Sequence, residues 1–224
     1  MYSAARRASF RELQLLPGDS VLIAGIGTGL DLPHIPAGVT IVGVDANPWM
    51  LQRARNVRRN PTIGLVLGDA QSLPCANARF DAIVLHLILS VAADPTAVFR
   101  EAVRVARPGG KIAVIEQFAP ETGIGWARRG LNRLARLGGT DITRRLPTII
   151  AGQPVEVRNE VPALLCTYRV ITMQRTETDA AAICRSAYWQ WPTRKRWRSQ
   201  GATDGAFEEF FDRPTAHARA GGAR

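Results

Sequence analysis

Residues 21–30 read Val-Leu-Ile-Ala-Gly-Ile-Gly-Thr-Gly-Leu, an apolar run that ends in three glycines at alternate positions. The apolar run is typical of a buried strand. Glycines let a ligand lie against bare backbone, and a helix after such a loop directs its amide donors at a negative group. The spacing of Gly25, Gly27 and Gly29 differs from the G-x-G-x-x-G pattern of dinucleotide folds, whose third glycine comes one residue later. Alone, the stretch predicts a ligand loop but not the ligand.

A second apolar run ends on an acid where a nucleoside site would need one. Residues 40–44 form this run and Asp45 follows it, roughly twenty residues after the glycines, where a carboxylate accepts hydrogen bonds from both hydroxyls of a ribose. An acid that only caps the next helix is the alternative. Together with the glycine loop, Asp45 predicts an adenosine-containing cofactor.

Further apolar runs at residues 63–67, 80–85 and 111–118 are predicted strands, with helical patterns between them. One ends before Gly68-Asp69-Ala70, and the next runs into residues 86–90, which we expect to face the reacting centre. Closing strands are predicted at 154–160 and 168–174. The prediction is an α/β fold: a Rossmann-like, doubly wound, mostly parallel sheet of about seven strands, with helices on both faces and ligands at the carboxyl edge.

Helices are predicted around these strands. Residues 3–16 have an amphipathic pattern, Asn47-Pro48 begins a second helix and Asp94-Pro95 begins a third. Trp49 or Met50, at the start of the second helix, is placed to cover the flat face of an adenine. The alternative is that Leu51 belongs to the core and that Trp49 is an exposed side chain that packs at the start of the helix.

Composition narrows the class of protein. The 224 residues include 29 Lys and Arg against 19 Asp and Glu, a net charge of +10 that favours an anionic partner. Three scattered cysteines without a C-x-x-C pair indicate neither a disulfide framework nor a zinc site, and we expect no metal. No signal peptide is evident, and no apolar run reaches the roughly 18 residues of a membrane span. We expect a cytoplasmic protein, with peripheral binding at the inner membrane as a further hypothesis.

As a set, these motifs resemble the class I S-adenosylmethionine-dependent methyltransferases with a methyltransferase type 11 domain. Residues 84–90, followed by Asp94-Pro95, are most similar to the bacterial phosphatidylethanolamine N-methyltransferase branch, close to the ubiquinone and menaquinone C-methyltransferases. The resemblance covers residues 10–175. Its motifs are the glycine loop, Asp45 with Asn47-Pro48-x-Met50, Gly68-Asp69-Ala70-x-x-Leu73-Pro74, Phe80-Asp81 and Arg107-Pro108-Gly109-Gly110.

The resemblance implies S-adenosylmethionine as the cofactor and a role for each matching position. The glycine loop would hold the methionine part, the second strand end the ribose, and the third strand end together with Met50 the adenine. The fourth strand end would face the methyl group. The implied cofactor-binding residues are Gly25, Gly27, Thr28, Gly29, Asp45, Ala46, Met50, Asp69, Ala70, Leu85 and His86.

The sequence departs from the family pattern at two places. The family carries an acid two residues before the first glycine, where this chain has Ile23, so a carboxylate that orients the amino-acid end of the cofactor is missing. The family segment before the first helix is expected to be short or missing here. A cofactor-binding protein with weak or lost methyltransferase activity is therefore an alternative function.

Methyl transfer needs alignment and, for a protonated amine or an alcohol, removal of a proton. His86 is the first candidate for that proton transfer and Glu116, near the end of the fifth strand, the second. A structural hydrogen bond is the alternative for His86, and a capping role for Glu116. We expect the acceptor to be the amine head group of a phospholipid or a similar lipophilic small molecule. C- or O-methylation of a quinone or small metabolite is the alternative.

The rest of the chain divides into two parts. Residues 1–178 are predicted to form the methyltransferase domain, and residues 120–150 an insertion on the acceptor side. In the insertion, apolar side chains alternate with Arg128, Arg129, Arg133 and Arg136, a pattern typical of a helix on an anionic membrane surface or of a solvated arginine face. Residues 179–224 are rich in Trp and Arg and are expected to be a poorly ordered extension. Nucleic-acid binding through them is a minor alternative.

Overall fold

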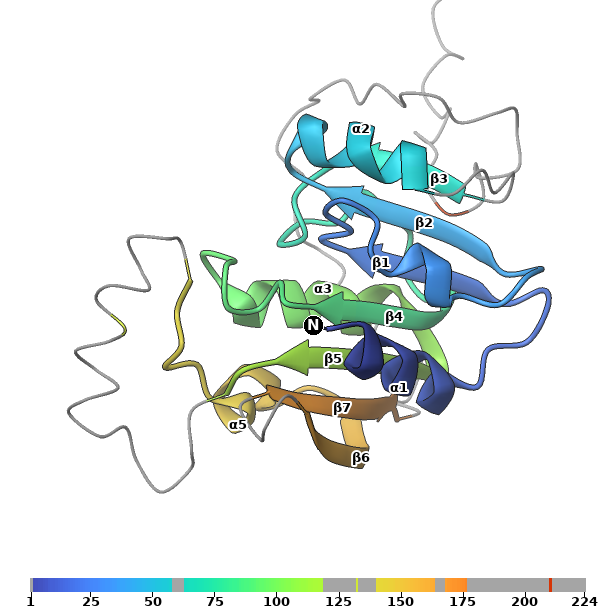
Figure 1. Cartoon of the computed structure of the whole chain (residues 1–224). Coiled ribbons are helices and arrows are strands. Elements are labelled where there is room, and N and C mark those ends of the chain that lie inside the picture. Colours follow the sequence, from blue (N-terminus) through green and yellow to red (C-terminus); the bar gives the residue numbers. More distant parts are fainter. Residues whose placement is uncertain are drawn as a thin grey trace, which may run out of the picture.

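The computed structural model describes residues 2–57, 63–118, 132, 140–163, 168–176 and 210. Within them, seven strands form one sheet in the order β3-β2-β1-β4-β5-β7-β6, with helices on both faces (Figure 1). The first five strands are parallel, and β7 runs antiparallel to both β5 and β6. The predicted doubly wound, mostly parallel sheet is confirmed.

Strands and helices largely alternate through the first half of the chain, except that β4 follows β3 with no helix between them. Their bounds are α1 (Ser3–Leu13), β1 (Ser20–Ala24), the 3-10 helix η1 (Leu32–His34), β2 (Thr40–Asp45), α2 (Pro48–Val57), β3 (Ile63–Leu67), β4 (Phe80–His86), α3 (Pro95–Val105), β5 (Ala106–Glu116), α5 (Leu146–Ile150), β6 (Val155–Ala163) and β7 (Tyr168–Arg175).

The central strands are apolar on both sides because each face of the sheet is covered by helices. Along β1, Val21 and Ile23 belong to an apolar cluster with α1 and α2, whereas Leu22 and Ala24 belong to a second cluster with α3 and α5. All five residues of β1 are buried. Such a strand reads as a continuous apolar run, which is the pattern that the sequence shows.

Both helix starts predicted from Asn-Pro and Asp-Pro pairs are present. The Asn47 side chain accepts a hydrogen bond from the backbone N–H of Trp49 at 2.9 Å. The Asp94 side chain accepts hydrogen bonds from Thr96 and Ala97 at 2.9 and 3.0 Å. These caps satisfy amide donors that have no partner within the first helical turn. They also fix where each helix begins after the strand that precedes it.

The first helix, α1, packs on the sheet over β5 and β7. Its buried face differs from the amphipathic pattern, because Arg6 and Ser9 are buried beside Ala5, Phe10 and Leu13. Buried polar side chains need partners. Arg6 and Ser9 find theirs on the segment after the glycine loop and at the end of β4.

The expectations for the insertion and the extension fall largely outside the described residues. Arg128, Arg129, Arg133 and Arg136 lie there, as does the chain after residue 176 except for Phe210. Phe210 is only 4% exposed, stacks on Phe80 with ring centroids 5.1 Å apart, and accepts a hydrogen bond from the Ala76 N–H. This residue of the predicted extension is therefore part of the core. No described helix is long and apolar enough to cross a membrane.

Candidate active site

A cavity of about 610 Å³ lies at the carboxyl edge of the parallel strands, within the range of roughly 300–1,000 Å³ typical of small-molecule sites. Its walls are the ends of β2 and β4 and the loops that follow β1, β2, β3 and β4, together with residues of α1, α2 and α3. The side chains and backbone that line it are Arg6, Gly25, Ile26, Gly27, Thr28, Leu30, Asp31, Val44, Asp45, Ala46, Asn47, Met50, Gly68, Asp69, Ala70, Gln71, His86, Leu87, Ile88, Val91, Ala92, Ala93 and Val98.

The three glycines of the loop after β1 have different tasks. All have positive φ angles, of 72°, 56° and 80° for Gly25, Gly27 and Gly29. A Cβ atom on Gly27 would meet nothing within 4 Å, whereas one on Gly29 would lie 3.0 Å from the Cα atom of Ala54 in α2. Gly25 and Gly27 line the cavity. Gly29, which the sequence also assigned to the cofactor, instead lets α2 pack closely against the loop.

Asp45 ends β2 and fixes the glycine loop. Its Oδ2 accepts a hydrogen bond from the Gly27 N–H at 2.7 Å, and its Oδ1 accepts one from the Asn47 N–H at 2.9 Å. A carboxylate has about four acceptor positions, so these two bonds leave positions for a diol in the cavity. Asp45 thus joins the loop after β1 to the start of α2, and it lines the cavity as predicted.

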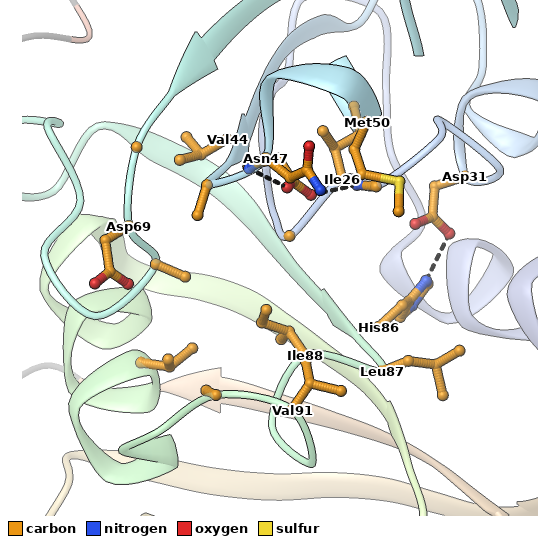
Figure 2. Close-up of a pocket in the computed structure, with 18 of the residues that line it drawn as sticks. Ile26, Asp31, Val44, Asn47, Met50, Asp69, His86, Leu87, Ile88 and Val91 are labelled. Atoms are coloured by element: carbon orange, nitrogen blue, oxygen red, sulfur yellow. Dashed lines mark hydrogen bonds and ion pairs between the residues drawn. The ribbon is translucent and has the colours of Figure 1, made fainter. Parts of the chain in front are cut away.

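Asp69 lies at the far end of the cavity from Asp31 and His86 (Figure 2). Its Oδ1 accepts a hydrogen bond from the Gln71 backbone N–H at 2.8 Å, and the Gln71 side chain donates to both carboxylate oxygens at 3.1 Å. The Gln71 Oε1 accepts from the Asp94 N–H at 2.7 Å, which ties this end of the cavity to the start of α3. Ala70 lies beside Asp69 in the wall.

Met50 and Trp49 separate in the structure. Met50 is 37% exposed and lines the cavity, where Figure 2 shows it beside Ile26. Trp49 is 74% exposed and is absent from the cavity wall. Of the two side chains that the sequence offered for the adenine face, only Met50 is therefore in position.

At the other end of the cavity, His86 is part of a buried polar network. Its Nδ1 lies 2.6 Å from the Oδ1 of Asp31, and its Nε2 lies 2.9 Å from the Ser9 hydroxyl. Arg6 donates to the same Asp31 oxygen at 2.6 Å. Burial raises the pKa of Asp31, but the neighbouring His86 and Arg6 outweigh it and hold that pKa below its usual value. Asp31 is therefore ionised, and it accepts the Nδ1–H of the imidazole.

Ser9, which accounts for the second ring nitrogen of His86, is fully buried. Both ring nitrogens of His86 therefore have hydrogen-bond partners within the protein, and neither points unpaired into the cavity. His86 lines the cavity as the sequence predicts. Its role as a general base stays a prediction, and the contacts describe a side chain that joins α1, the segment after the glycine loop and β4.

Two further predicted residues lie outside the residues that line the cavity. Leu85 is fully buried and packs in the apolar cluster with α3, because successive side chains of β4 point to opposite faces of the sheet. Glu116 is 1% exposed and accepts hydrogen bonds from the Ser90 and Gln117 N–H groups, both at 2.9 Å. Burial raises the pKa of Glu116. Through Ser90, Glu116 holds the loop after β4 that forms one wall of the cavity.

The sequence did not single out Arg6, Asp31 or Gln71 as site residues. Asp31 follows the third glycine by two positions, and this closeness to the loop was the available signal. Arg6 read as one cation on the polar face of an amphipathic helix. Its partner is 25 residues away in sequence and His86 is 55 residues from Asp31. No local pattern reports a contact over such separations.

Comparison with known proteins finds a family model described as "Methyltransferase domain" that matches residues 22–114. The phosphatidylethanolamine N-methyltransferase of Cereibacter sphaeroides is 31% identical over 150 residues, which cover 65% of this chain and 74% of that protein. The demethylmenaquinone methyltransferase of Renibacterium salmoninarum is 35% identical over 119 residues, covering 53% of this chain and 49% of that protein. The chain thus spans about half the length of the latter relative.

Solved structures share the fold at low sequence identity. Geranyl diphosphate C-methyltransferase from Streptomyces coelicolor A3(2), in complex with S-adenosyl-L-homocysteine, has a TM-score of 0.65 and 15% identity, covering 77% of this chain and 76% of that chain. A methyltransferase-like protein from Bacillus halodurans has a TM-score of 0.67 and 14% identity, covering 78% and 100%. With this fold, this domain match and these relatives, the chain belongs to the class I S-adenosylmethionine-dependent methyltransferases.

Proposed function

We propose that the protein transfers the methyl group of S-adenosylmethionine to the amine head group of a phospholipid or a similar lipophilic small molecule. The observation that carries this proposal is the apolar rim of the cavity. Leu30 and Val91 line the cavity and are nevertheless 58% and 50% exposed. Exposed apolar side chains at the mouth of a site favour an acceptor with an apolar body. The Cereibacter relative, whose name refers to phosphatidylethanolamine, supports a lipid acceptor.

The residues of the cavity fit the cofactor. Asp45 presents a carboxylate where a ribose diol would lie, Met50 offers an apolar surface for a base, and Asp69 presents an acceptor for an exocyclic amino group. Gly27 leaves open space in the loop wall. When bound, S-adenosylmethionine supplies a methyl group on a sulfonium, which a nucleophile attacks in line.

The chain itself contributes alignment and exclusion of water. Leu87, Ile88 and Val91 form an apolar wall below the cavity in Figure 2, on the His86 side. The hydrogen bond from the Ser90 N–H to Glu116 fixes this wall. Holding two reactants in line in a dry site supplies much of what a displacement of this kind needs. A protonated amine must still lose a proton, and His86 is the titratable side chain closest to this wall in sequence.

Methylation of a quinone ring carbon is a second candidate function. The Renibacterium relative carries the name demethylmenaquinone methyltransferase. The apolar rim of Leu30 and Val91 suits an isoprenoid quinone as well as an acyl chain. The two acceptors differ at the reacting atom, because an amine loses a proton from nitrogen and a quinol from carbon.

Radiolabelled methyl transfer separates these functions. The full chain is incubated with methyl-labelled S-adenosylmethionine and either phosphatidylethanolamine vesicles or demethylmenaquinol in detergent micelles. Label in the phospholipid supports the proposal, and label only in the quinone replaces it with the second candidate. Cofactor binding by calorimetry without label in either acceptor or in a total lipid extract would support a binding protein without this activity. Asp45→Asn serves as the cofactor-site control and is expected to lose label in every case.

We also propose that Arg128, Arg129, Arg133 and Arg136 bring the protein to an anionic membrane surface. Their support is the sequence pattern and the net charge of +10, since each cation near an anionic surface contributes about 1 kcal/mol. Replacing all four with Gln should weaken co-sedimentation with phosphatidylglycerol vesicles. Unchanged co-sedimentation would refute this role. Replacing the exposed Arg7, Arg11, Arg53 and Arg100 with Gln provides the matched loss of four surface charges.

A further inference from the structure

We propose that Asp31 binds the amino group of the methionine part of the cofactor, in place of the acid that is absent at Ile23. The inference rests on the proposed function, because it assigns a residue to one end of the same cofactor. It accounts for how a site without a carboxylate at the end of β1 can still recognise a cationic ammonium group.

Within the described residues, Ile23 lies in apolar surroundings. It is 1% exposed and packs in the apolar cluster of α1 and α2, pairing with Gly43 of β2 and Val84 of β4. The residues of β1 are Ser-Val-Leu-Ile-Ala, so this strand supplies no carboxylate at all. Any acid for this end of the cavity must come from another segment.

Asp31 supplies such an acid from the segment that follows the glycine loop. It lies directly before η1, is 2% exposed, and lines the cavity. Figure 2 shows it with His86 at the end of the cavity remote from Asp69. Because Gly25, Gly27 and Thr28 lie in the same wall, the amino-acid part of a cofactor whose adenine is at Asp69 would reach Asp31.

The charges around Asp31 match a zwitterion. Arg6 also lines the cavity, and its guanidinium lies 2.6 Å from Asp31. The ammonium and carboxylate groups that an α-amino acid carries on its α-carbon would meet Asp31 and Arg6, respectively. Within the described residues, the hydrogen bonds to this carboxylate from Arg6 and His86 both end on Oδ1. Further acceptor positions of the carboxylate therefore remain for a donor in the cavity.

A purely structural ion pair is the competing explanation. A buried pair generally adds little net stability, because desolvation of both charges offsets their attraction. Asp31 and Arg6 do connect α1 to the segment after the glycine loop. If this structural role were their only one, neither side chain would contact a ligand. The two explanations differ in whether the effect of Asp31 depends on the amino group of the ligand.

The test compares two ligands that share an adenosine part. S-adenosylhomocysteine carries the amino-acid group, whereas 5′-methylthioadenosine ends after the sulfur. Calorimetry on the full chain measures both affinities for wild type and Asp31→Asn. We expect Asp31→Asn to weaken S-adenosylhomocysteine by about 10- to 100-fold, since a hydrogen bond to a charged group is worth about 1.5–3 kcal/mol. We expect the affinity for 5′-methylthioadenosine to stay within about twofold, since that ligand lacks the group.

Each other outcome overturns the inference. Equal weakening of both ligands would assign Asp31 to the structure of the loop, and no weakening of either would remove it from the site. If wild type binds neither ligand, the proposed function is refuted as well. If wild type binds both ligands and Asp31→Asn lacks the expected difference between them, the inference fails and the proposed function stands. If Asp31→Asn does not fold, Arg6→Met with Asp31→Asn removes the pair together, and the same ligand difference is expected.

Asp81→Asn is the matched control. Asp81 is also ion-paired, to Arg107 at 2.5 Å, and accepts hydrogen bonds from Ser20. Its pKa is likewise lowered, since hydrogen bonds from Ser20 and the charge of Arg107 outweigh the effect of burial. It lies at the start of β4, at the opposite edge of the sheet from the cavity. Its replacement should change neither ligand affinity.

Discussion

The different tasks of Gly27 and Gly29 predict that two alanine substitutions in one loop fail in different ways. In Gly29→Ala, the new Cβ atom would lie 3.0 Å from the Ala54 Cα and 3.1 Å from its Cβ, at a φ of 80°. The left-handed conformation costs about 1–2 kcal/mol in a residue with a Cβ atom, and overpacking costs about 1–3 kcal/mol. We therefore expect Gly29→Ala to lower the free energy of unfolding by about 2–5 kcal/mol.

Gly27→Ala carries the backbone penalty alone, because its Cβ atom would meet nothing within 4 Å. We expect a loss of about 1–2 kcal/mol in stability. The new methyl group would instead occupy the cavity wall, so affinity for S-adenosylhomocysteine should fall by about tenfold or more. Urea unfolding and calorimetry measure the two quantities. A stability loss in Gly27→Ala equal to that of Gly29→Ala would refute this division of tasks.

Three other perturbations test the packing and the charges. Phe210→Ala should lower the unfolding free energy by about 3–5 kcal/mol, because it empties the site stacked on Phe80, and an effect below 1 kcal/mol in urea unfolding would show that Phe210 does not dock there. Asp31 has a lowered pKa in the folded state, so its contribution to stability is complete at pH values well above its ordinary pKa of 3.8 and is lost as the pH falls through the folded pKa. Unfolding free energies measured at pH 2–6 should show this loss in wild type but not in Asp31→Asn. Glu116 has a raised pKa in the folded state, so the unfolding free energy of wild type should fall as the pH rises from 4.5 toward that folded pKa. Glu116→Gln should flatten this dependence of the unfolding free energy on pH. An identical dependence in the variant would contradict the raised pKa of Glu116.

The fold was accessible from the sequence because each central strand is apolar on both sides and each is followed by a turn or a cap. Residues 40–44 and 63–67 illustrate this, since the first apolar run lies within β2 and the second coincides with β3. The ends Asp45 and Asp69 lie in the cavity as predicted, because parallel strands bring their carboxyl ends to one edge.

The sequence did not reveal to which face of the sheet a side chain points, or which residues far apart in the chain make contact. A strand buried on both faces gives no alternation, so nothing in the run Val-Leu-His distinguishes Leu85, which faces α3, from His86, which faces α1. The buried Arg6 and Ser9 look like polar-face residues until their partners are known. Phe210 lies 130 residues from Phe80, and such a contact has no local signal.

The two acidic ends of the cavity differ in exposure and in their partners, and this difference predicts one orientation of a ligand without reference to relatives. Asp69 is exposed and hydrogen-bonds to the neutral Gln71, whereas Asp31 is 2% exposed and contacts Arg6 and His86. Coulomb interactions strengthen as the surroundings lose water. A charged group therefore gains the most binding free energy at Asp31, whereas a neutral, hydrogen-bonding base gains comparatively little binding free energy there. A ligand with a neutral base at one end and a zwitterion at the other is therefore expected to place the zwitterion at Asp31. Under the proposal for Asp31, the apolar residue at position 23 removes a charge from β1, and Asp31 supplies that charge from another segment of the site.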